Sequence, residues 1–287
     1  MKKLLTIGTR ASKLALWQAN HVNDFLLNNF PYIDVELREI ITTGDANSED
    51  TIESFGGKNI FVKEIEQALI SKEIDIAVHS YKDLPAKLPE GLEVISTSNR
   101  EDPRDVLVSK SNKTLMDLND NPKIGTGSSR RSEQLAHIRK DVNIIPIRGN
   151  VDTRIRKALE TDIDGVVLAN AGIKRLGLSN HVCELFDIDV IVPSPLQGFL
   201  AIETREDADL TKYFEYFSSE ESVLVSNYER QFLKDLNLGC QYPAGFCMQV
   251  HNDNKFSFNY FLKGSKKEVK NKEVFSYSDL LAQYSKM

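Results

Sequence analysis

The stretch Ile74-Asp75-Ile76-Ala77-Val78-His79-Ser80-Tyr81-Lys82-Asp83-Leu84-Pro85 decides the fold of this chain. Its first five residues are mostly apolar and predict a buried strand, and residues 61–71 before it have the apolar spacing of a helix. Toward the N-terminus, strands are expected at 4–7 and 33–37 and a helix at 11–29. Short strands that alternate with helices are typical of a mostly parallel sheet covered by helices. The sequence therefore predicts the α/β class.

The same alternation starts again after a charged, proline-bearing stretch, Arg100-Glu101-Asp102-Pro103-Arg104-Asp105. The elements expected in this second part are strands at 123–125, 143–147 and 165–168 and helices at 129–140 and 151–160. Another proline-bearing stretch, Pro193-Ser194-Pro195, ends it, which predicts two α/β units joined by two crossings and hinged around a cleft. Ligands of open α/β sheets bind outside the carboxyl ends of the strands, so we expect functional residues there.

The last part of the chain has a different pattern, which predicts a small α+β domain. Its expected elements are a helix over 220–236, strands near 246–250 and 256–262, and a final helix. The predicted division is an α/β domain 1 of residues 1–98 and 199–217, an α/β domain 2 of residues 104–193, and an α+β domain 3 of residues 220–287.

Composition argues against several classes of protein. The chain has 287 residues, a net charge of −6, three cysteines and a mean hydropathy of −0.33. No apolar run approaches the ~20 residues of a membrane-spanning helix, and the N-terminal apolar stretch is shorter than that of a secretory signal. The acidic balance argues against a dedicated nucleic-acid binder, and neither cysteines nor histidines have metal-site spacing. We therefore expect a cytoplasmic protein with reduced thiols and no metal, membrane or nucleic-acid partner.

Basic residues are concentrated between 123 and 156, where eight Lys and Arg accompany three acidic residues. Three of them fit solvated helix faces, whereas four lie where a strand passes into a helix: Arg130, Arg131, Arg148 and Arg154. The segment Gly125-Thr126-Gly127-Ser128-Ser129 precedes a helix, where backbone N–H groups and hydroxyls bind anions. Guanidinium groups bind carboxylates through two parallel hydrogen bonds. This pattern predicts a polyanionic ligand with carboxylates.

Two strand ends in the first part add to this prediction. Asp83, beside Lys82 and before a proline turn, can act as a general acid or base, and a loop ion pair is the alternative. Thr9-Arg10-Ala11-Ser12 places another arginine at the end of the first strand. Arg, Lys or Asp at three separate strand ends favours a ligand site over isolated surface charges.

Cys240 lies in a loop with Gly239, Pro243 and Gly245, where a thiol can be presented to a ligand. A thiolate there could be a nucleophile or a point of covalent attachment. Cys183 and Cys247 lie in helix-like and strand-like patterns and are expected to pack in the interior. The polar stretch 42–59 is too long for an ordinary α/β connection, so we expect either a mobile functional loop or a disordered one.

Many segments match one known family in order. They are Thr9-Arg10-x-Ser12 with Leu14 to Gln18, Thr43-Gly44-Asp45, Gly56-Gly57-Lys58 with Phe61 to Glu64, Asp75 to Ser80 with Lys82, Asp83 and Pro85, Arg100 to Asp105, Gly125-Thr126-x-Ser128-x-Arg130-Arg131, Arg148 to Val151 with Thr153 and Arg154, Ala171-Gly172-x-Lys174-Arg175-Leu176-Gly177, Gln197-Gly198, and Gly239-Cys240-Gln241-x-Pro243. The chain thereby resembles the porphobilinogen deaminases, also called hydroxymethylbilane synthases.

The resemblance implies a transferase of tetrapyrrole (haem) biosynthesis. Members of this family join four porphobilinogen molecules head to tail, release ammonia, and then free hydroxymethylbilane by hydrolysis. They do so on a dipyrromethane cofactor that is joined by a thioether to the loop cysteine, here Cys240. The implied fold is two hinged α/β domains of the periplasmic-binding-protein type plus a small α+β domain. A monomer is expected, with a possible hand-off of product to uroporphyrinogen III synthase.

The resemblance also implies roles for individual residues. Asp83 would be the catalyst, bonding pyrrole N–H groups, assisting loss of the amine and stabilising the cationic azafulvene. The residues implied to hold the cofactor are Cys240, Lys82, Asp83, Thr126, Ser128, Arg130 and Arg131. Those implied to bind substrate and the growing chain are Arg10, Ser12, Gln18, Arg148, Arg154, Arg175 and Gln197. Loop 42–59 would cover the site, with Lys58 and Phe61 at its downstream hinge.

The chain departs from the family pattern at Tyr81, Gly127, Phe199 and Leu238, none of which has an implied chemical role. The part after residue 250 is short and matches only loosely. The competing prediction is a non-catalytic two-lobed solute-binding protein for a small polycarboxylate, which would leave Asp83 and Cys240 without a task. A thiol-dependent hydrolase is a more distant alternative, because no histidine is placed to serve Cys240.

Overall fold

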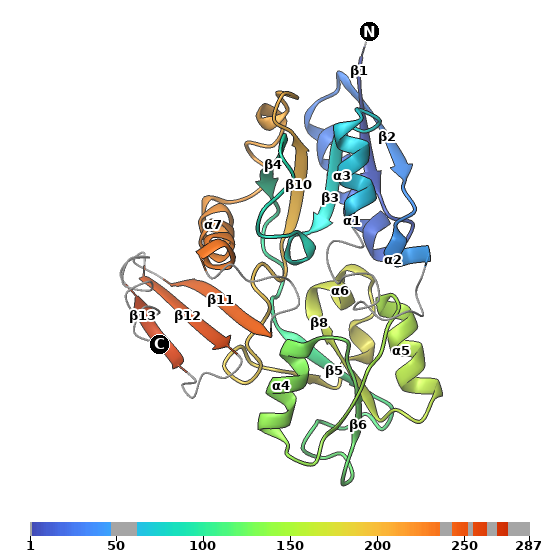
Figure 1. Cartoon of the computed structure of the whole chain (residues 1–287), viewed down its shortest axis with the longest axis vertical. Coiled ribbons are helices and arrows are strands. Elements are labelled where there is room, and N and C mark those ends of the chain that lie inside the picture. Colours follow the sequence, from blue (N-terminus) through green and yellow to red (C-terminus); the bar gives the residue numbers. More distant parts are fainter. Residues whose placement is uncertain (1, 47–61, 236–242, 252–254, 263–268, 275–287) are drawn as a thin grey trace. The chain divides into compact units, whose positions relative to one another are not determined.

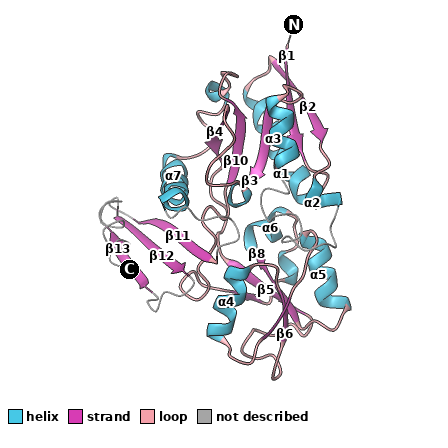
Figure 2. Ribbon diagram, in the orientation of Figure 1, coloured by secondary structure: helices cyan, strands magenta, loops and turns pink. Residues whose placement is uncertain are grey.

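The computed structural model describes residues 2–46, 62–235, 243–251, 255–262 and 269–274. The chain forms two compact units, shown in Figures 1 and 2. Unit 1 consists of Met1–Glu101 and Gly198–Val223, and unit 2 of Asp102–Gln197 and Leu224–Met287. The chain thus passes between units three times, after Glu101, after Gln197 and, within the first turn of the last described helix, after Val223.

Unit 1 is built on a five-stranded sheet with the order β2-β1-β3-β10-β4. Its strands are β1 (Lys3–Thr9), β2 (Ile33–Glu39), β3 (Ile76–Ser80), β4 (Leu92–Thr97) and β10 (Leu200–Arg205). Strand β1 is parallel to β2 and β3, whereas β10 is antiparallel to both β3 and β4. Four of the five strands therefore run in one direction.

Helices cover both faces of this sheet because its strands alternate their side chains between two apolar clusters. Ile76 and Val78 pack with α1 (Lys13–Asn29), and Ala77 packs with α3 (Lys63–Ile70). The remaining short elements are α2 (Thr43–Ala46), η2 (Tyr81–Asp83) and η4 (Thr211–Tyr213).

Unit 2 contains a second five-stranded sheet with the order β7-β6-β8-β5-β9. Its elements are β5 (Asp105–Ser109), β6 (Lys123–Gly125), α4 (Ser129–Ile138), β7 (Asn143–Ile145), α5 (Val151–Glu160), β8 (Gly165–Ala169), α6 (Asn170–Arg175), η3 (Ser179–His181) and β9 (Glu184–Leu185). Strand β5 is antiparallel to β8 and β9, and β6 is parallel to β7 and β8. In both sheets the antiparallel strand comes directly after a crossing, so the two units share one topology.

The C-terminal part consists of helix α7 (Glu220–Asp235) and an antiparallel sheet of β11 (Ala244–His251), β12 (Lys255–Leu262) and β13 (Val269–Val274). The rings of Phe232 and Phe246 stack with centroids 4.2 Å apart and join the helix to the sheet. Strand β13 was not predicted, because its sequence is largely charged. The expected final helix falls on 275–287, outside the described residues.

The predicted α/β class, with two α/β units and a smaller C-terminal α+β part, is confirmed by these sheets. Most expected elements are present within one to three residues of the predicted ends. The sequence pattern did not reveal β4, β5, β9 and β10. Strands β5 and β10 were missed because each follows a segment that was interpreted as a crossing. The exact domain boundaries, including a separate domain at 220–287, stay predictions.

The first two crossings begin and end side by side in unit 1, where Glu101 N–H donates to Gly198 O at 3.1 Å. Gly198 has φ +99°, and a Cβ there would be 2.2 Å from Glu101 O. A side chain at this position would therefore push the two neighbouring backbone segments apart. The Gly198 position is fixed by close backbone approach.

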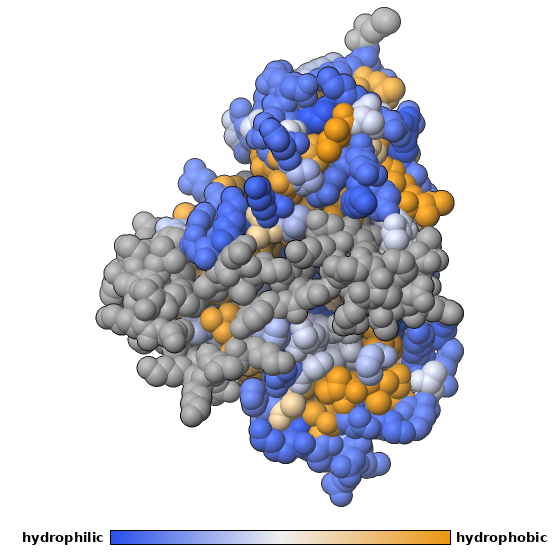
Figure 3. Space-filling view, viewed as in Figure 1, coloured by the Kyte–Doolittle hydropathy of each residue, from blue (hydrophilic) through white to orange (hydrophobic). Residues whose placement is uncertain are grey.

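The described surface in the view of Figure 3 is mostly hydrophilic, with apolar side chains in small patches. Among the described residues, no helix is both long and apolar enough to span a bilayer.

Candidate functional site

The predicted site residues of unit 1 gather at one edge of its sheet. Strands β1 and β3 are parallel neighbours, with Ile7 opposite Ile76, so they end at the same edge. Arg10 and Ser12 follow β1, and Lys82 and Asp83 follow β3. The structure therefore brings these predicted residues together, although they are about seventy positions apart in the sequence.

A 3₁₀ turn over Tyr81–Asp83 presents the proposed catalytic carboxylate. Tyr81 is 5% exposed and anchors the turn, and its N–H donates to Phe199 O at 3.1 Å. Leu84 is fully buried, and its N–H closes the turn on Tyr81 O at 3.2 Å. Between these two buried residues Lys82 is half-buried and Asp83 is exposed. Buried Tyr81 and Leu84 thus fix the turn at both ends, while Asp83 is exposed to solvent.

Helix α1 supports the same edge through two residues predicted to bind substrate. Ser12 is the N-cap of α1, and its hydroxyl accepts a hydrogen bond from Ala15 N–H at 3.3 Å. Gln18 is 3% exposed, and its Nε2 donates to Ser80 Oγ at 2.8 Å. Gln18 therefore ties α1 to the end of β3, a structural task that the sequence pattern did not indicate. The substrate-binding role of both residues stays a prediction.

In unit 2 the predicted anion site is the start of helix α4. Ser128 is its N-cap, with Oγ accepting from Arg131 N–H at 3.4 Å. Thr126 is buried, and its Oγ1 accepts from Ser128 N–H at 3.2 Å. Two hydroxyls and the positive end of a ten-residue helix therefore lie together at the carboxyl end of β6.

Arg130 and Arg131 extend from this helix into the interior, where Asp105 binds both. The two residues are 4% and 5% exposed, and each guanidinium group donates to one Asp105 oxygen at 2.7 Å. Each also donates to a backbone oxygen, Arg130 to Val192 O at 2.6 Å and Arg131 to Val167 O at 3.1 Å. The two arginines are thus held by an internal carboxylate rather than extended into solvent.

Gln197 completes this buried network. Its Nε2 donates to Asp105 Oδ1 at 2.9 Å and to Pro103 O at 2.6 Å. Burial alone would raise the pKa of Asp105, but the charges of Arg130 and Arg131 and the hydrogen bonds outweigh it and hold the pKa below its usual range. Asp105 therefore stays ionised and leaves the network with one net positive charge.

The remaining predicted arginines of unit 2 are half-buried at the neighbouring helix ends. Arg148 precedes α5, and Arg154 lies in its first turn with Nε donating to Gly149 O at 2.6 Å. Arg175 is the last residue of α6. These positions agree with carboxylate binding at the sheet edge, although no described contact tests that role.

Sequence reasoning missed Asp105, which it placed in a crossing. The apolar run Val106-Leu107-Val108 directly after it is a usable signal, because it predicts a buried strand that would carry Asp105 inside with it. Three predicted residues, Lys58, Phe61 and Cys240, and the departure at Leu238 lie outside the described residues.

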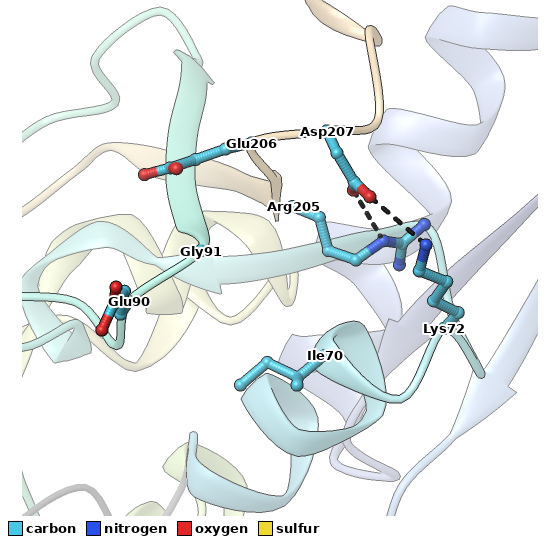
Figure 4. Close-up of a pocket in the computed structure, with 7 residues that line it drawn as sticks. All are labelled: Ile70, Lys72, Glu90, Gly91, Arg205, Glu206 and Asp207. Carbon is cyan, nitrogen blue, oxygen red and sulfur yellow. Dashed lines mark hydrogen bonds and ion pairs between the residues drawn. The ribbon is translucent and has the colours of Figure 1, made fainter.

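A pocket of about 290 Å³ lies at the opposite edge of the unit 1 sheet, near the end of α3 and the start of β4 (Figure 4). Both of its cations contact one carboxylate: Lys72 Nζ lies 3.3 Å from Asp207 Oδ2, and Arg205 Nε lies 3.4 Å from Asp207 Oδ1. The lining also holds Glu90 and Glu206. This balance of charge does not favour a polycarboxylate.

The two other described departures from the family pattern have local explanations. Phe199 is 1% exposed, and the Arg100 guanidinium lies 4.8 Å from its ring centroid, a cation–π contact. At Gly127 a Cβ would be 2.9 Å from Ile147 O, so the backbone here favours glycine. Neither departure alters Asp83 or the arginines.

Fold and site together define a two-unit α/β protein whose strand ends carry arginines, hydroxyl groups and the exposed acid Asp83. The family model described as "Porphobilinogen deaminase, dipyromethane cofactor binding domain" matches residues 5–213. The chain belongs to the porphobilinogen deaminase family.

Curated porphobilinogen deaminases are similar in sequence to this protein over most of its length. The porphobilinogen deaminase of Syntrophomonas wolfei is 46% identical over 241 residues, which are 84% of this chain and 79% of that protein. The porphobilinogen deaminase of Brevibacillus brevis is 44% identical over 252 residues, 88% of this chain and 82% of that protein.

Solved structures with a similar fold are more distant. The methionine-binding protein MetQ has a TM-score of 0.46 at 16% identity, covering 79% of this chain and 95% of its own. A TRAP periplasmic solute-binding protein from Desulfovibrio salexigens has a TM-score of 0.46 at 11% identity, covering 82% of this chain and 78% of its own. These two matches say nothing about what this chain binds.

Proposed function

We propose that this chain is a transferase that joins four porphobilinogen molecules head to tail, with loss of ammonia, and releases hydroxymethylbilane by hydrolysis. The observation that carries the proposal is the exposed Asp83 on a rigid turn at a strand end, in a chain of this family. A solute-binding protein needs no such acid. We further propose that the enzyme is cytoplasmic and monomeric and passes its product to uroporphyrinogen III synthase.

The donor groups of unit 2 fit a dipyrromethane cofactor, which carries carboxylates. Thr126, Ser128, Arg130 and Arg131 lie together at the start of α4. Among the described residues, Arg131 Nε is a buried donor without a hydrogen-bond partner. A buried guanidinium N–H needs an acceptor, and a cofactor carboxylate would supply one. We propose that these four residues and Lys82 hold the cofactor and that Cys240 binds it covalently.

When bound, the cofactor supplies the pyrrole end to which the first substrate is joined. The residues of the chain do the rest. Arg10, Arg148, Arg154 and Arg175 bind the acetate and propionate groups of the substrate and the growing chain, with Ser12, Gln18 and Gln197 in support. Lys58 and Phe61 are proposed for the hinge of a cover over the site.

Asp83 acts on the substrate itself. Its carboxylate accepts hydrogen bonds from pyrrole N–H groups and from the protonated amine, which leaves as ammonia when its C–N bond breaks. The positive charge that develops on the pyrrole is stabilised by the same carboxylate. A fixed turn serves this task, because a carboxylate that is already oriented does not have to reorganise during the reaction.

Intact mass and Ehrlich's reagent test the proposal on the purified protein. We expect the mass to exceed that of the sequence by one covalent dipyrromethane and the denatured protein to react with the reagent. The variant Cys240→Ser should lose the surplus mass, the colour and the turnover of porphobilinogen. Cys183→Ser is the matched control and should keep all three.

Two outcomes would contradict the proposal. Active protein with the mass of the bare sequence would refute covalent attachment. Protein that binds a polycarboxylate but never consumes porphobilinogen would favour the solute-binding alternative.

A further inference from the structure

Three ionisable side chains that the proposed reaction does not use are buried together in unit 1. Glu66 of α3, His79 of β3 and Glu203 of β10 are 4%, 5% and 0% exposed. His79 Nε2 lies 3.0 Å from Glu203 Oε2, the distance of an ion pair. Within the described part of the chain, Glu66 Oε1, both Glu203 oxygens and His79 Nε2 lack hydrogen-bond partners, so the His79–Glu203 contact is electrostatic. The three groups therefore depend on one another to stabilise their charges.

The sheet brings these groups to the face that packs against α3. Glu203 is paired with Ala77, which belongs to the α3 cluster, and His79 lies two residues further along β3 on the same face. Within the described residues, no set of three His, Cys, Asp or Glu side chains is arranged to hold a metal ion. The relevant properties of the three side chains are therefore their protonation and their electrostatic interactions.

Other charged groups on this face are already engaged. Arg205 of β10 donates to Leu69 O and Ile74 O at 2.8 and 2.7 Å and lies 3.5 Å from Asp75. The residues of β1 and β4 that face α3 are not titratable. Glu93 of β4 is not among them, because it is paired with Thr204, whose side chain lies on the other face of the sheet. Glu66 thus faces His79 and Glu203.

His79 lies directly before the residues that lead into the catalytic turn. From the α1 side of the sheet, Gln18 holds Ser80. Phe199, the residue before β10, accepts the Tyr81 N–H through its backbone oxygen, and Glu203 of β10 lies against His79. These two contacts add to the backbone pairing of β10 with β3 and hold the end of β3 on both sides of Ser80.

We propose that His79 and Glu203 are a positioning pair for the turn that carries Lys82 and Asp83, and that Glu66 sets the charge of this pair. The inference rests on the proposed function, because it concerns the rate at which Asp83 acts. The three side chains are too deeply buried to touch substrate and act through the backbone of β3.

The charge of the cluster changes near neutral pH. Burial, and next the charge of Glu203, raise the pKa of Glu66 to about 7, while His79 opposes the shift. With Glu66 protonated, one carboxylate faces one imidazole. Loss of the proton adds a second buried carboxylate, which competes for the imidazole and weakens its hold on Glu203. Turnover should therefore decline above pH 7.

Kinetics of the cofactor-loaded enzyme test the positioning role. We expect Glu203→Gln to lower kcat for porphobilinogen by ~10- to 100-fold, because a misplaced catalytic group costs rate, while KM stays within about twofold. Glu203→Asp should recover part of the loss. Glu206→Gln, the same chemical change at an exposed position three residues along, should leave both constants unchanged. Glu66→Gln should abolish the decline of kcat above pH 7.

Thermal unfolding tests the charge of Glu66 separately from the kinetics. This test still applies if Glu203→Gln folds poorly. Because the pKa of Glu66 is higher in the folded state, that state binds the proton more tightly, and stability is lost as pH rises from 4.5 through about 7. Glu66→Gln removes this loss. We expect its Tm, relative to wild type, to be higher at pH 8 than at pH 5 by about 4 °C or more.

Each outcome separates this inference from the proposed function. If wild type consumes porphobilinogen but Glu203→Gln matches Glu206→Gln in kcat and pH profile, the positioning role is refuted and the function stands. If wild type consumes none, the function fails first. An unchanged pH dependence of Tm in Glu66→Gln would refute the assigned charge of the cluster.

Discussion

We expect Asp83→Asn to lower kcat for porphobilinogen by ~10²–10⁴-fold, the range for loss of a general acid or base. Asparagine keeps the size and the turn but cannot carry the negative charge or the proton. Because Asp83 is exposed, and the turn is anchored by Tyr81 and Leu84, Tm should stay within about 2 °C of wild type. The covalent pyrrole should also remain, as intact mass will show.

Two variants sharpen this test. Asp24→Asn, an exposed change on α1, should leave turnover unchanged. Asp83→Glu keeps the charge on a longer side chain, and we expect a rate between those of Asp83→Asn and wild type. Turnover of Asp83→Asn within about threefold of wild type, with the cofactor in place, would remove Asp83 from the proposed mechanism.

The α/β pattern could be predicted because apolar periodicity is local. Strand β3 and helix α5 follow directly from residues 74–78 and 151–160. Strand β5 has a local signal in Val106-Leu107-Val108, but it was overlooked because the strand begins directly at a charged crossing. Strand β10 also begins beside a crossing, and it pairs with β3 about 120 residues earlier in the chain, so its placement depends on tertiary pairing.

The same distinction between local signals and tertiary contacts applies to the candidate site. The positions of Asp83 and Arg10 in unit 1, and of Ser128 and Arg148 in unit 2, could be predicted, because topology alone brings the ends of parallel strands to one edge of each sheet. What each side chain contacts could not. The contact of Arg130 with buried Asp105, for example, depends on a strand 25 residues earlier in the chain.

The largest effect on stability is expected from that network. Asp105→Asn removes the negative charge that compensates two guanidinium groups in the interior, where breaking a buried ion pair costs about 3–5 kcal/mol. At about 2–4 °C per kcal/mol, the Tm of the protein should fall by about 6–20 °C. We also expect the loaded fraction to fall, because Arg130 and Arg131 would lose the group that orients them.

The matched control is Asp162→Asn, which removes a surface ion pair with Lys123 in the same unit. Exposed pairs contribute about 0–1 kcal/mol, so its Tm should barely change. An equal shift in both variants would mean that the Asp105 network adds nothing beyond ordinary surface charge, contrary to its burial.

The pH dependence gives an independent test. Because the two arginines hold the pKa of Asp105 below its usual range in the folded state, its stabilisation is complete above the unfolded value of 3.8 and is lost as pH falls below it. Wild type should therefore lose stability between pH 4 and 2 faster than Asp105→Asn, which has no such carboxylate to protonate. Parallel acid profiles for the two proteins would show that Asp105 is not ionised against Arg130 and Arg131. The net positive charge proposed to receive a cofactor carboxylate would then have to be reconsidered.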